Sequence, residues 1–257
     1  MKRQTREQKR GEIRYREKLV EQQVIGRCRY FDDHPLRMQD LVQDWINPQL
    51  DDLQRFVASL GINKSAKILE LGCENGHCSS FLADQGYFAV GLDISLASLR
   101  LGVPLVRSEL GFQTVPFLTN GDIASLPFRS KSFDVVFCFS CLHHFPGLDE
   151  PLVEIHRVLR EGGQFFCSWE PLKSLAHSFK SFYDKVRKVP PPTEVEYDIH
   201  EGKYSYFQWI SSLEREGFEI EQINTSVKWL PRTGFDPVDR FFASLTGFSV
   251  EIVCRKI

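Results

Sequence analysis

A regular succession of short apolar runs and helical stretches, from Ala66 to Trp169, is the feature that most constrains the fold of this chain. The run Val135–Phe139 is apolar on both faces, as a parallel strand covered by two helical layers must be. Parallel neighbours require a crossover connection, usually a helix, so the pattern predicts an open, mostly parallel sheet between helices. The five strands are expected at 68–71, 88–92, 115–118, 135–139 and 164–169.

The helices expected between these strands include one from the turn after 71 through Leu82, one that begins after Ser95 and is broken near Gly102 and Pro104, and one at 151–161. The last third departs from this rhythm. It begins with a basic amphipathic helix at 172–188, which the prolines at 190–192 end. Only a short turn at Thr246-Gly247 precedes the final strand, so we expect that strand to be antiparallel and the sheet to have seven strands. The remaining predicted elements are helices at 4–24, 36–60, 204–216 and 236–246 and strands at 218–223 and 248–253.

Composition excludes several classes of protein. Hydrophobic residues make up 42% and charged residues 26% of the 257 positions, which is ordinary for a globular chain. No run approaches the roughly 18 apolar residues of a membrane span, and the polar start does not resemble a signal peptide. Seven cysteines, an odd number, are typical of reduced thiols. We therefore expect a cytoplasmic protein.

Charge is unevenly distributed. Residues 1–29 hold ten Lys or Arg and four Glu, a net charge of +6 in a chain whose total is −2. Such a basic arm could bind an anionic partner such as RNA or a membrane surface. A solvated helix of mixed charge is the simpler interpretation, because the rest of the chain is acidic and nucleic-acid binders usually carry a basic domain.

Polar residues follow four of the predicted strands at the edge where ligands bind in such sheets. Glu70 to Gly76 follows the first strand, and Asp93 ends the second. Asp122 follows the third, and Ser140 to His144 follow the fourth. Asp93 comes 21 positions after Gly72, close to the spacing from which a carboxylate reaches ribose hydroxyls. Asp122 can accept a hydrogen bond from an adenine amino group. An adenosine ligand is therefore expected.

The turn after the first strand distinguishes among adenosine ligands. Dinucleotide sites need G-x-G-x-x-G, so that backbone can approach a pyrophosphate, but Glu74 and His77 stand at the second and third glycine positions. A carboxylate there repels a pyrophosphate, which disfavours NAD and FAD. A ligand that has an α-ammonium in place of phosphates fits, and S-adenosylmethionine is such a ligand.

Five segments in this order resemble those of class I SAM-dependent methyltransferases, in the broad group of the ubiquinone and menaquinone biosynthesis enzymes. The resemblance covers about residues 64–170 and implies a Rossmann-like, doubly wound sheet. It implies that Gly72 and Gly76 lie near the methionine end of the cofactor, that Asp93 binds ribose, and that Asp122 with Ile123 frames adenine. Glu74 departs from a common third glycine. The segments are Glu70–Gly76, Val90–Ser95, Gly121–Phe128, Ser132–Val136 with Leu142–Phe145, and Glu154–Gly163.

The full predicted site combines these positions with others at the same strand ends. His143 and His144 lie where the acceptor pocket of the family opens, and either one could act as general base. Cys138 and Cys141 form C-x-x-C without a second pair at zinc spacing, so we expect core thiols and no metal. The residues expected to bind the cofactor are Glu70, Gly72, Cys73, Gly76, Asp93, Ile94, Asp122, Ile123 and Ser140.

The predicted function is methyl transfer from S-adenosylmethionine to a small molecule, which could be amphiphilic or anionic. We expect an N-terminal helical arm or cap at 1–60, and a methyltransferase domain at 61–257 with a lid insertion at about 171–203. The basic face of that insertion is also consistent with peripheral membrane contact. The alternatives are an RNA methyltransferase that uses the basic arm, and a non-catalytic scaffold that keeps the fold.

Overall fold

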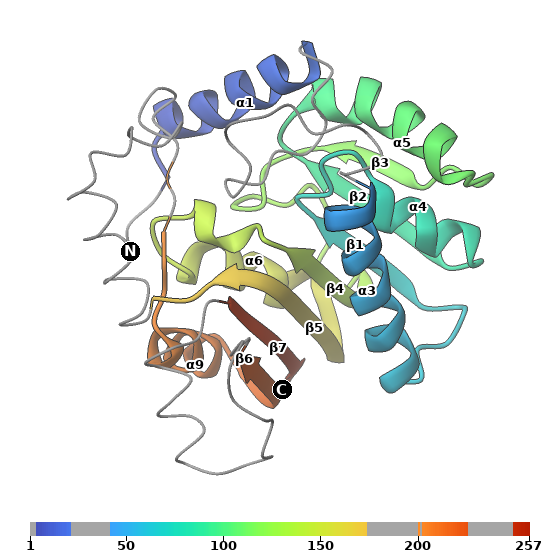
Figure 1. Cartoon of the computed structure of the whole chain (residues 1–257). Helices are drawn as coiled ribbons and strands as arrows, with labels where there is room; N and C mark the ends of the chain where they lie inside the picture. Colours follow the sequence, from blue (N-terminus) through green and yellow to red (C-terminus); the bar gives the residue numbers. More distant parts are fainter. Residues whose placement is uncertain (1–3, 22–41, 174–199, 201, 226–248) are drawn as a thin grey trace.

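The computed structural model describes residues 4–21, 42–173, 200, 202–225 and 249–257, and its central element is one seven-stranded sheet (Figure 1). The strand order is β3-β2-β1-β4-β5-β7-β6. The chain runs outward from β1 to β3 and returns to β4 on the other side of β1, so the order reverses between β1 and β4. The strands are β1 (Lys67–Leu71), β2 (Phe88–Asp93), β3 (Phe117–Asn120), β4 (Phe133–Phe139), β5 (Leu159–Pro171), β6 (Phe218–Thr225) and β7 (Ser249–Lys256).

Strand directions follow the prediction. The pairs among β1 to β5 are all parallel, whereas β7 runs antiparallel to both of its neighbours, β5 and β6. The seven-stranded sheet and its antiparallel last strand are thus confirmed. In a sheet of this kind the ligand crevice lies beyond the carboxyl ends of the strands, at the point of reversal.

Helices cover both faces of the sheet, and β4 explains why. Its alternate side chains enter two separate apolar clusters: Phe137 packs with Phe56 of α3 on one face, and Val136 packs with Leu152 of α6 on the other. The strand is therefore buried on both sides, as its sequence predicted. The first layer includes α3 (Asn47–Ser59) and α4 (His77–Asp84), and the second includes α6 (Asp149–Val158) and α9 (Tyr206–Arg215).

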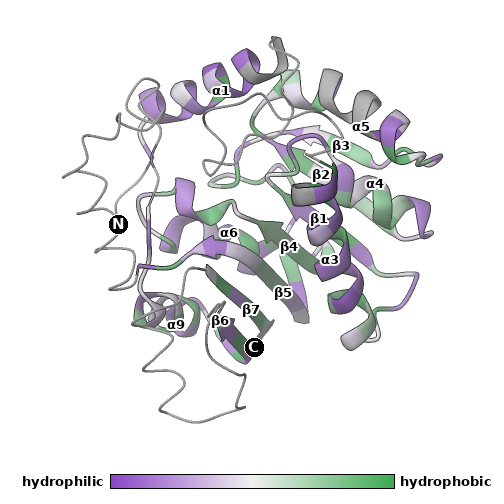
Figure 2. Cartoon of the chain, in the orientation of Figure 1, coloured by the Kyte–Doolittle hydropathy of each residue, from purple (hydrophilic) through white to green (hydrophobic). Residues whose placement is uncertain are grey.

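The hydropathy of the ribbon reflects these layers (Figure 2). The central strand β4 is largely hydrophobic, and α1 (Arg6–Glu21) is largely hydrophilic. In the described ranges, no helix is both long and apolar enough to cross a bilayer.

Two predicted boundaries were wrong. The third strand lies at Phe117–Asn120 and not at 115–118. The helix expected to reach 161 ends at Val158, and β5 begins at Leu159. Leu159 already pairs with Phe133 of β4, and the glycine pair Gly162-Gly163 forms an irregularity within the strand, where Gly162 has a φ of +70°. The glycines therefore bend a strand that has already begun.

The predicted break near Gly102 and Pro104 takes the form of a change of helix type. A π-helical segment (Ser98–Gly102) leads into α5 (Val103–Leu110), and Pro104 is the second residue of α5. Proline is tolerated there because the first-turn N–H groups of a helix have no intrahelical acceptor. Another π-helical segment (Val42–Ile46) precedes α3. Residues 36–41, most of the predicted lid and the predicted helix at 236–246 lie outside the described residues.

Gly72 occupies the tightest point of the turn after β1. Its φ is +65°, and a Cβ there would lie 2.5 Å from Cys141 Sγ. A side chain would therefore meet both backbone strain and a steric clash with the loop after β4. The glycine at this position allows the β1 and β4 loops to approach each other.

We expect Gly72→Ala to lower the free energy of unfolding by about 2–4 kcal/mol, because strain and overpacking add. Gly86→Ala is the matched control, since Gly86 has a φ of +84° and a Cβ placed there would face open space, with no packed atom within 4 Å. The control should cost about 1–2 kcal/mol, the backbone strain alone. Urea unfolding of both variants measures the difference, and equal losses would contradict the steric argument.

Candidate functional site

Asp93, at the end of β2, connects two loops at the carboxyl edge of the sheet. Its Oδ1 accepts a hydrogen bond from the backbone N–H of Ser95 (2.7 Å), and its Oδ2 accepts one from the N–H of Glu74 (2.8 Å). The residue is buried, and burial raises the pKa of Asp93 to about 6, although the charge of Arg16 and the two N–H donors oppose that rise. At neutral pH Asp93 is therefore a carboxylate, and each oxygen keeps a second lone pair for a hydroxyl donor.

Glu70 fixes α4 against β1. Its Oε2 accepts from the backbone N–H of Ser79 (2.8 Å) and from the hydroxyl of the same residue. Burial raises the pKa of Glu70 to about 8, against the effect of these hydrogen bonds. Glu70 thus holds the helix that follows the turn, and its direct contact with a cofactor stays a prediction.

The turn between β1 and α4 contains three residues with left-handed backbone. Gly72 and Gly76 have φ of +65° and +67°, and Glu74 between them has a φ of +46°. A non-glycine residue in this region costs about 1–2 kcal/mol. The side chain of Glu74 has a strong partner, since its Oε1 accepts from Arg16 Nη1 at 2.7 Å. Cys73 fixes the turn to β2 through its N–H, which donates to the carbonyl of Leu92 (3.0 Å).

Asp122 lies beyond β3, on the far side of Asp93 from the glycine turn. Its Oδ1 accepts from the N–H of Ala124 (2.9 Å), and its Oδ2 pairs with Lys9 Nζ. Ile123 beside it is buried. The carbonyl of Ile94 accepts from the Asn120 side chain at 2.9 Å, which links the β2 and β3 loops.

Helix α1 lies across this edge of the sheet (Figure 1). Lys9 reaches Asp122 beyond β3, and Arg16 reaches Glu74 in the turn after β1. Just before the helix, Gln4 donates from its side chain to the carbonyl of His144 after β4 (3.2 Å). Two cations of the basic arm are therefore paired with acids of the same chain at the candidate site.

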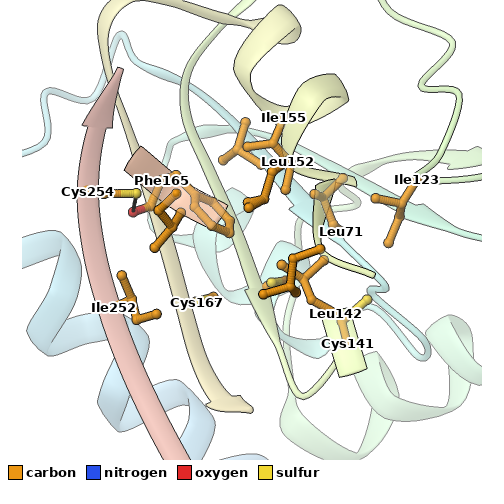
Figure 3. Packing of buried hydrophobic residues seen from close by; sticks show 14 of the residues in the cluster. Leu71, Ile123, Cys141, Leu142, Leu152, Ile155, Phe165, Cys167, Ile252 and Cys254 are labelled. Atoms are coloured by element: carbon orange, nitrogen blue, oxygen red, sulfur yellow. Dashed lines mark hydrogen bonds between the residues drawn. The ribbon is translucent and has the colours of Figure 1, made fainter. Parts of the chain in front are cut away.

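The loop after β4 packs on the apolar core and is hydrogen-bonded to β5. Cys141 and Leu142 pack in the same apolar cluster as Leu71 of β1 (Figure 3). Ser140 has a φ of +48°, and its N–H donates to the carbonyl of Ser168 at 2.9 Å. The 3-10 turn Leu142–His144 follows and presents both predicted histidines.

Glu170, near the end of β5, is a residue of this site that sequence reasoning missed. Its carboxylate accepts from the N–H groups of Cys141 (2.7 Å), Leu142 (2.8 Å) and His143 (3.0 Å), and it lies 3.0 Å from His143 Nδ1. Burial favours the neutral acid, but these donors outweigh it and lower the pKa of Glu170. An acid near the end of a buried strand, as at Glu70 and Asp93, was the signal that could have identified it.

A bulge in β5 directs Glu170 toward this loop. The pairing of β5 with β7 shifts between Cys167 and Glu170, and Trp169 within the shift has a φ of +65°. Bulges of this kind re-aim the side chains that follow them. The strain at Trp169 is accompanied by a hydrogen bond from its indole N–H to Asp52 Oδ2 (2.8 Å).

The two histidines are arranged differently. The ring centroids of His143 and His144 are 4.2 Å apart. His143 is pinned by Glu170, whereas His144 Nδ1 lies 3.3 Å from the carbonyl of His200 and 3.7 Å from Glu12 Oε2. Glu170 therefore fixes the ring of His143 at Nδ1, which orients its Nε2 lone pair.

The predicted C-x-x-C thiols lie in the core. Cys138 and Cys141 are buried, and burial raises the pKa of both thiols. Among the residues placed in the structure, no group of His, Cys, Asp and Glu is arranged to hold a metal ion.

Glu170→Gln should lower the free energy of unfolding at neutral pH by about 3 kcal/mol, because an NH₂ group then faces the backbone donors. Since the folded-state pKa of Glu170 is depressed, its contribution is present above the unfolded value of about 4.3 and is lost as pH falls through the folded value. Urea unfolding between neutral and acidic pH tests this. The exposed Glu214→Gln should change stability by less than about 0.5 kcal/mol; equal effects would refute the assignment.

Part of this chain, including the candidate site, matches a known protein family. Residues 69–167 match the model of a family described as a methyltransferase domain, a range that includes the glycine turn, Asp93, Asp122 and both histidines. The uncharacterized methyltransferase YcgJ of Bacillus subtilis is 24% identical over 196 residues, 74% of either chain. A demethylmenaquinone methyltransferase of Tropheryma whipplei is 29% identical over 184 residues, 66% of this chain and 72% of that protein.

Solved structures show the same fold. Magnesium protoporphyrin IX methyltransferase from Synechocystis, with bound SAH, superposes with a TM-score of 0.62 at 17% identity, over 92% of each chain. The sheet, its order and these matches define a class I SAM-dependent methyltransferase. Residues 69–167 match the methyltransferase-domain family, and S-adenosylmethionine is the cofactor of methyltransferases of this class. The predicted class, fold and cofactor are confirmed.

Proposed function

We propose that this chain transfers a methyl group from S-adenosylmethionine to a small amphiphilic or anionic molecule. Binding of the cofactor is supported mainly by the order of three carboxylates along one edge of the sheet. Asp122 lies beyond β3, Asp93 ends β2 and Glu74 follows β1, and these three strands are neighbours in the sheet. Adenine, ribose and the methionine tail follow each other in the same order in the cofactor.

Each of these residues suits the part of the cofactor assigned to it. Asp93 can accept from both ribose hydroxyls, because each of its oxygens currently accepts one backbone N–H. Asp122 can accept from the adenine amino group beside the apolar side chain of Ile123. Its Oδ2 is paired with Lys9, so adenine has to share or replace this ion pair.

The acceptor class rests on relatives and on the sequence. A fatty-acid O-methyltransferase of Mycolicibacterium smegmatis is 31% identical over 138 residues, 53% of this chain and 48% of that protein. Its name specifies a fatty acid, and that of the Tropheryma protein specifies demethylmenaquinone. The basic amphipathic segment at 172–188, mostly outside the described residues, suits an acceptor with an apolar body and an anionic group.

His143 is the better candidate for the general base. S-adenosylmethionine supplies an electrophilic methyl group on a sulfonium. For a protonated acceptor, the Nε2 of His143 takes the proton while Glu170 stabilises the imidazolium through Nδ1. The loops after β1 to β4 align the reactants, and α1, which lies across this edge of the sheet, excludes water from them.

Binding of the cofactor tests the first part of the proposal. Calorimetry should show that Asp93→Asn weakens affinity for S-adenosylmethionine by about 10- to 100-fold, because charge-assisted hydrogen bonds to ribose are lost. Since Asp93 is protonated below a pKa of about 6, wild-type affinity should fall below that pH by up to tenfold per unit. Unchanged affinity in the variant would contradict the ribose assignment.

A methyl-transfer screen with labelled donor tests the second part. Pools of fatty acids, quinols and other amphiphilic acids are compared with pools of RNA. With the acceptor found, His143→Gln should lower kcat by about 10²- to 10⁴-fold if a proton is removed, and His144→Gln should lower it by less than tenfold. Transfer to RNA alone would support the alternative of an RNA methyltransferase, which no contact among the described residues favours. Cofactor binding without any methyl transfer would favour the alternative of a non-catalytic scaffold.

A further inference from the structure

An exposed apolar patch lies at the edge of the sheet that β3 forms (Figure 1). Of the seven large hydrophobic residues that are exposed in the described ranges, three lie here: Phe88 is 43%, Val115 58% and Phe117 62% exposed. The rings of Phe88 and Phe117 stack, with their centroids 5.0 Å apart. We call these three residues the β3 patch. Single exposed apolar residues are normal on a protein surface, whereas a cluster of them marks a contact site.

The β3 patch belongs to a sheet face that helices cover elsewhere. Phe117 pairs in register with Val90 of β2, whose side chain lies in the apolar cluster that contains Leu152 of α6. Neighbours in register point to the same face, so Phe117 lies on the α6 face, beyond the part that is buried. Val115 faces the same way as Phe117, since both are exposed and Pro116 between them is buried. The patch is therefore a bare continuation of the core.

The outer backbone edge of β3 is also unprotected. Among the described residues, β3 pairs with β2 alone. Residues 110–121 include no charged side chain, whereas the other edge strand, β6, carries the exposed acids Glu219 and Glu221. Charged side chains on an edge strand hinder its pairing with another chain. The composition of β3 therefore indicates an edge that accepts a further strand, and that of β6 indicates one that does not.

Charge and area indicate which chain supplies the added strand. An interface between two copies of one surface opposes like charges wherever the surface is charged, so an uncharged surface such as this one suits its own copy. The β3 patch exposes about 300 Å² of apolar area, a size at which patches on monomers are often functional. With about 60% apolar area, an interface built around two such patches buries about 1,000 Å² in total, the lower limit for a specific dimer.

We propose that β3 is the dimerisation edge of this chain, which pairs with β3 of a second copy while the two β3 patches pack together on one face. A two-fold axis normal to the sheet reverses the strand direction, so the pairing is antiparallel and joins the two sheets into one. The carboxyl edges of the two sheets then point in opposite directions. Both candidate sites therefore stay open in the dimer.

Sedimentation velocity of the full chain between about 1 and 500 µM tests the proposal. The wild type should change from monomer to dimer in this range, as expected for an interface near the lower size limit. Phe117→Lys should weaken the dimer by at least about 100-fold, because each dimer loses two buried rings and gains two like charges. Phe88→Lys, which alters the patch but not β3, should weaken it by about tenfold or more. Phe207→Lys is the matched control, since Phe207 is 68% exposed on α9, outside the patch, and it should leave the dimer unchanged.

Amide hydrogen exchange distinguishes strand pairing from contact at another surface. Residues 117–120 should exchange more slowly at about 500 µM than at about 1 µM, whereas β6 should exchange equally at both concentrations. Urea unfolding of Phe117→Lys at about 1 µM should match that of the wild type, because the position is exposed in the single chain. A chain that stays monomeric up to about 500 µM, a dimer that both patch variants leave intact, or a dimer without protection of β3 would overturn the proposal.

Discussion

Buried carboxyl groups that accept hydrogen bonds from backbone N–H groups are the interaction on which this site depends. Glu70 holds α4, Asp93 holds the glycine turn, and Glu170 holds the turn that carries the histidines. Each one accepts hydrogen bonds from N–H groups that a loop or the first turn of a helix leaves without a backbone acceptor. The sheet brings the loops to one edge, and these acids fix their backbone. The negative charges of Asp93 and Glu170 also make the edge a receptor for hydroxyl, amino and ammonium groups.

Helix α1 adds the opposite charge. Its contacts with the site are mainly polar: Lys9 with Asp122, Arg16 with Glu74, and Gln4 at the base of the helix with the loop after β4. A cover attached in this way can exchange partners with a charged ligand more readily than one attached by an apolar face. The basic arm, which the sequence suggested as a contact for an external anion, is thus used in part inside the molecule.

Much of the fold was predictable, because short apolar strands separated by helices allow few arrangements. The positions of Asp93 at the end of β2 and of Asp122 just after β3 followed from the strand pattern. The boundaries at Leu159 and Phe117 were missed, because the pairing with which β5 and β3 begin depends on neighbours remote in sequence. Glu170 was missed for a similar reason: a bulge at Trp169 determines its direction, and local periodicity carries no sign of it. The pairing of Arg16 with Glu74 spans 58 positions and could not be deduced from either segment.

The buried cysteines around the glycine turn have a consequence for an enzyme that handles an alkylating agent. A sulfonium methyl group reacts with thiolates, and Cys73 lies in the turn itself while Cys141 Sγ closely faces Gly72. Burial raises the pKa of both thiols, so they stay protonated and are poor nucleophiles. The burial that lets these small side chains pack in the core therefore also protects the protein against methylation by its own cofactor.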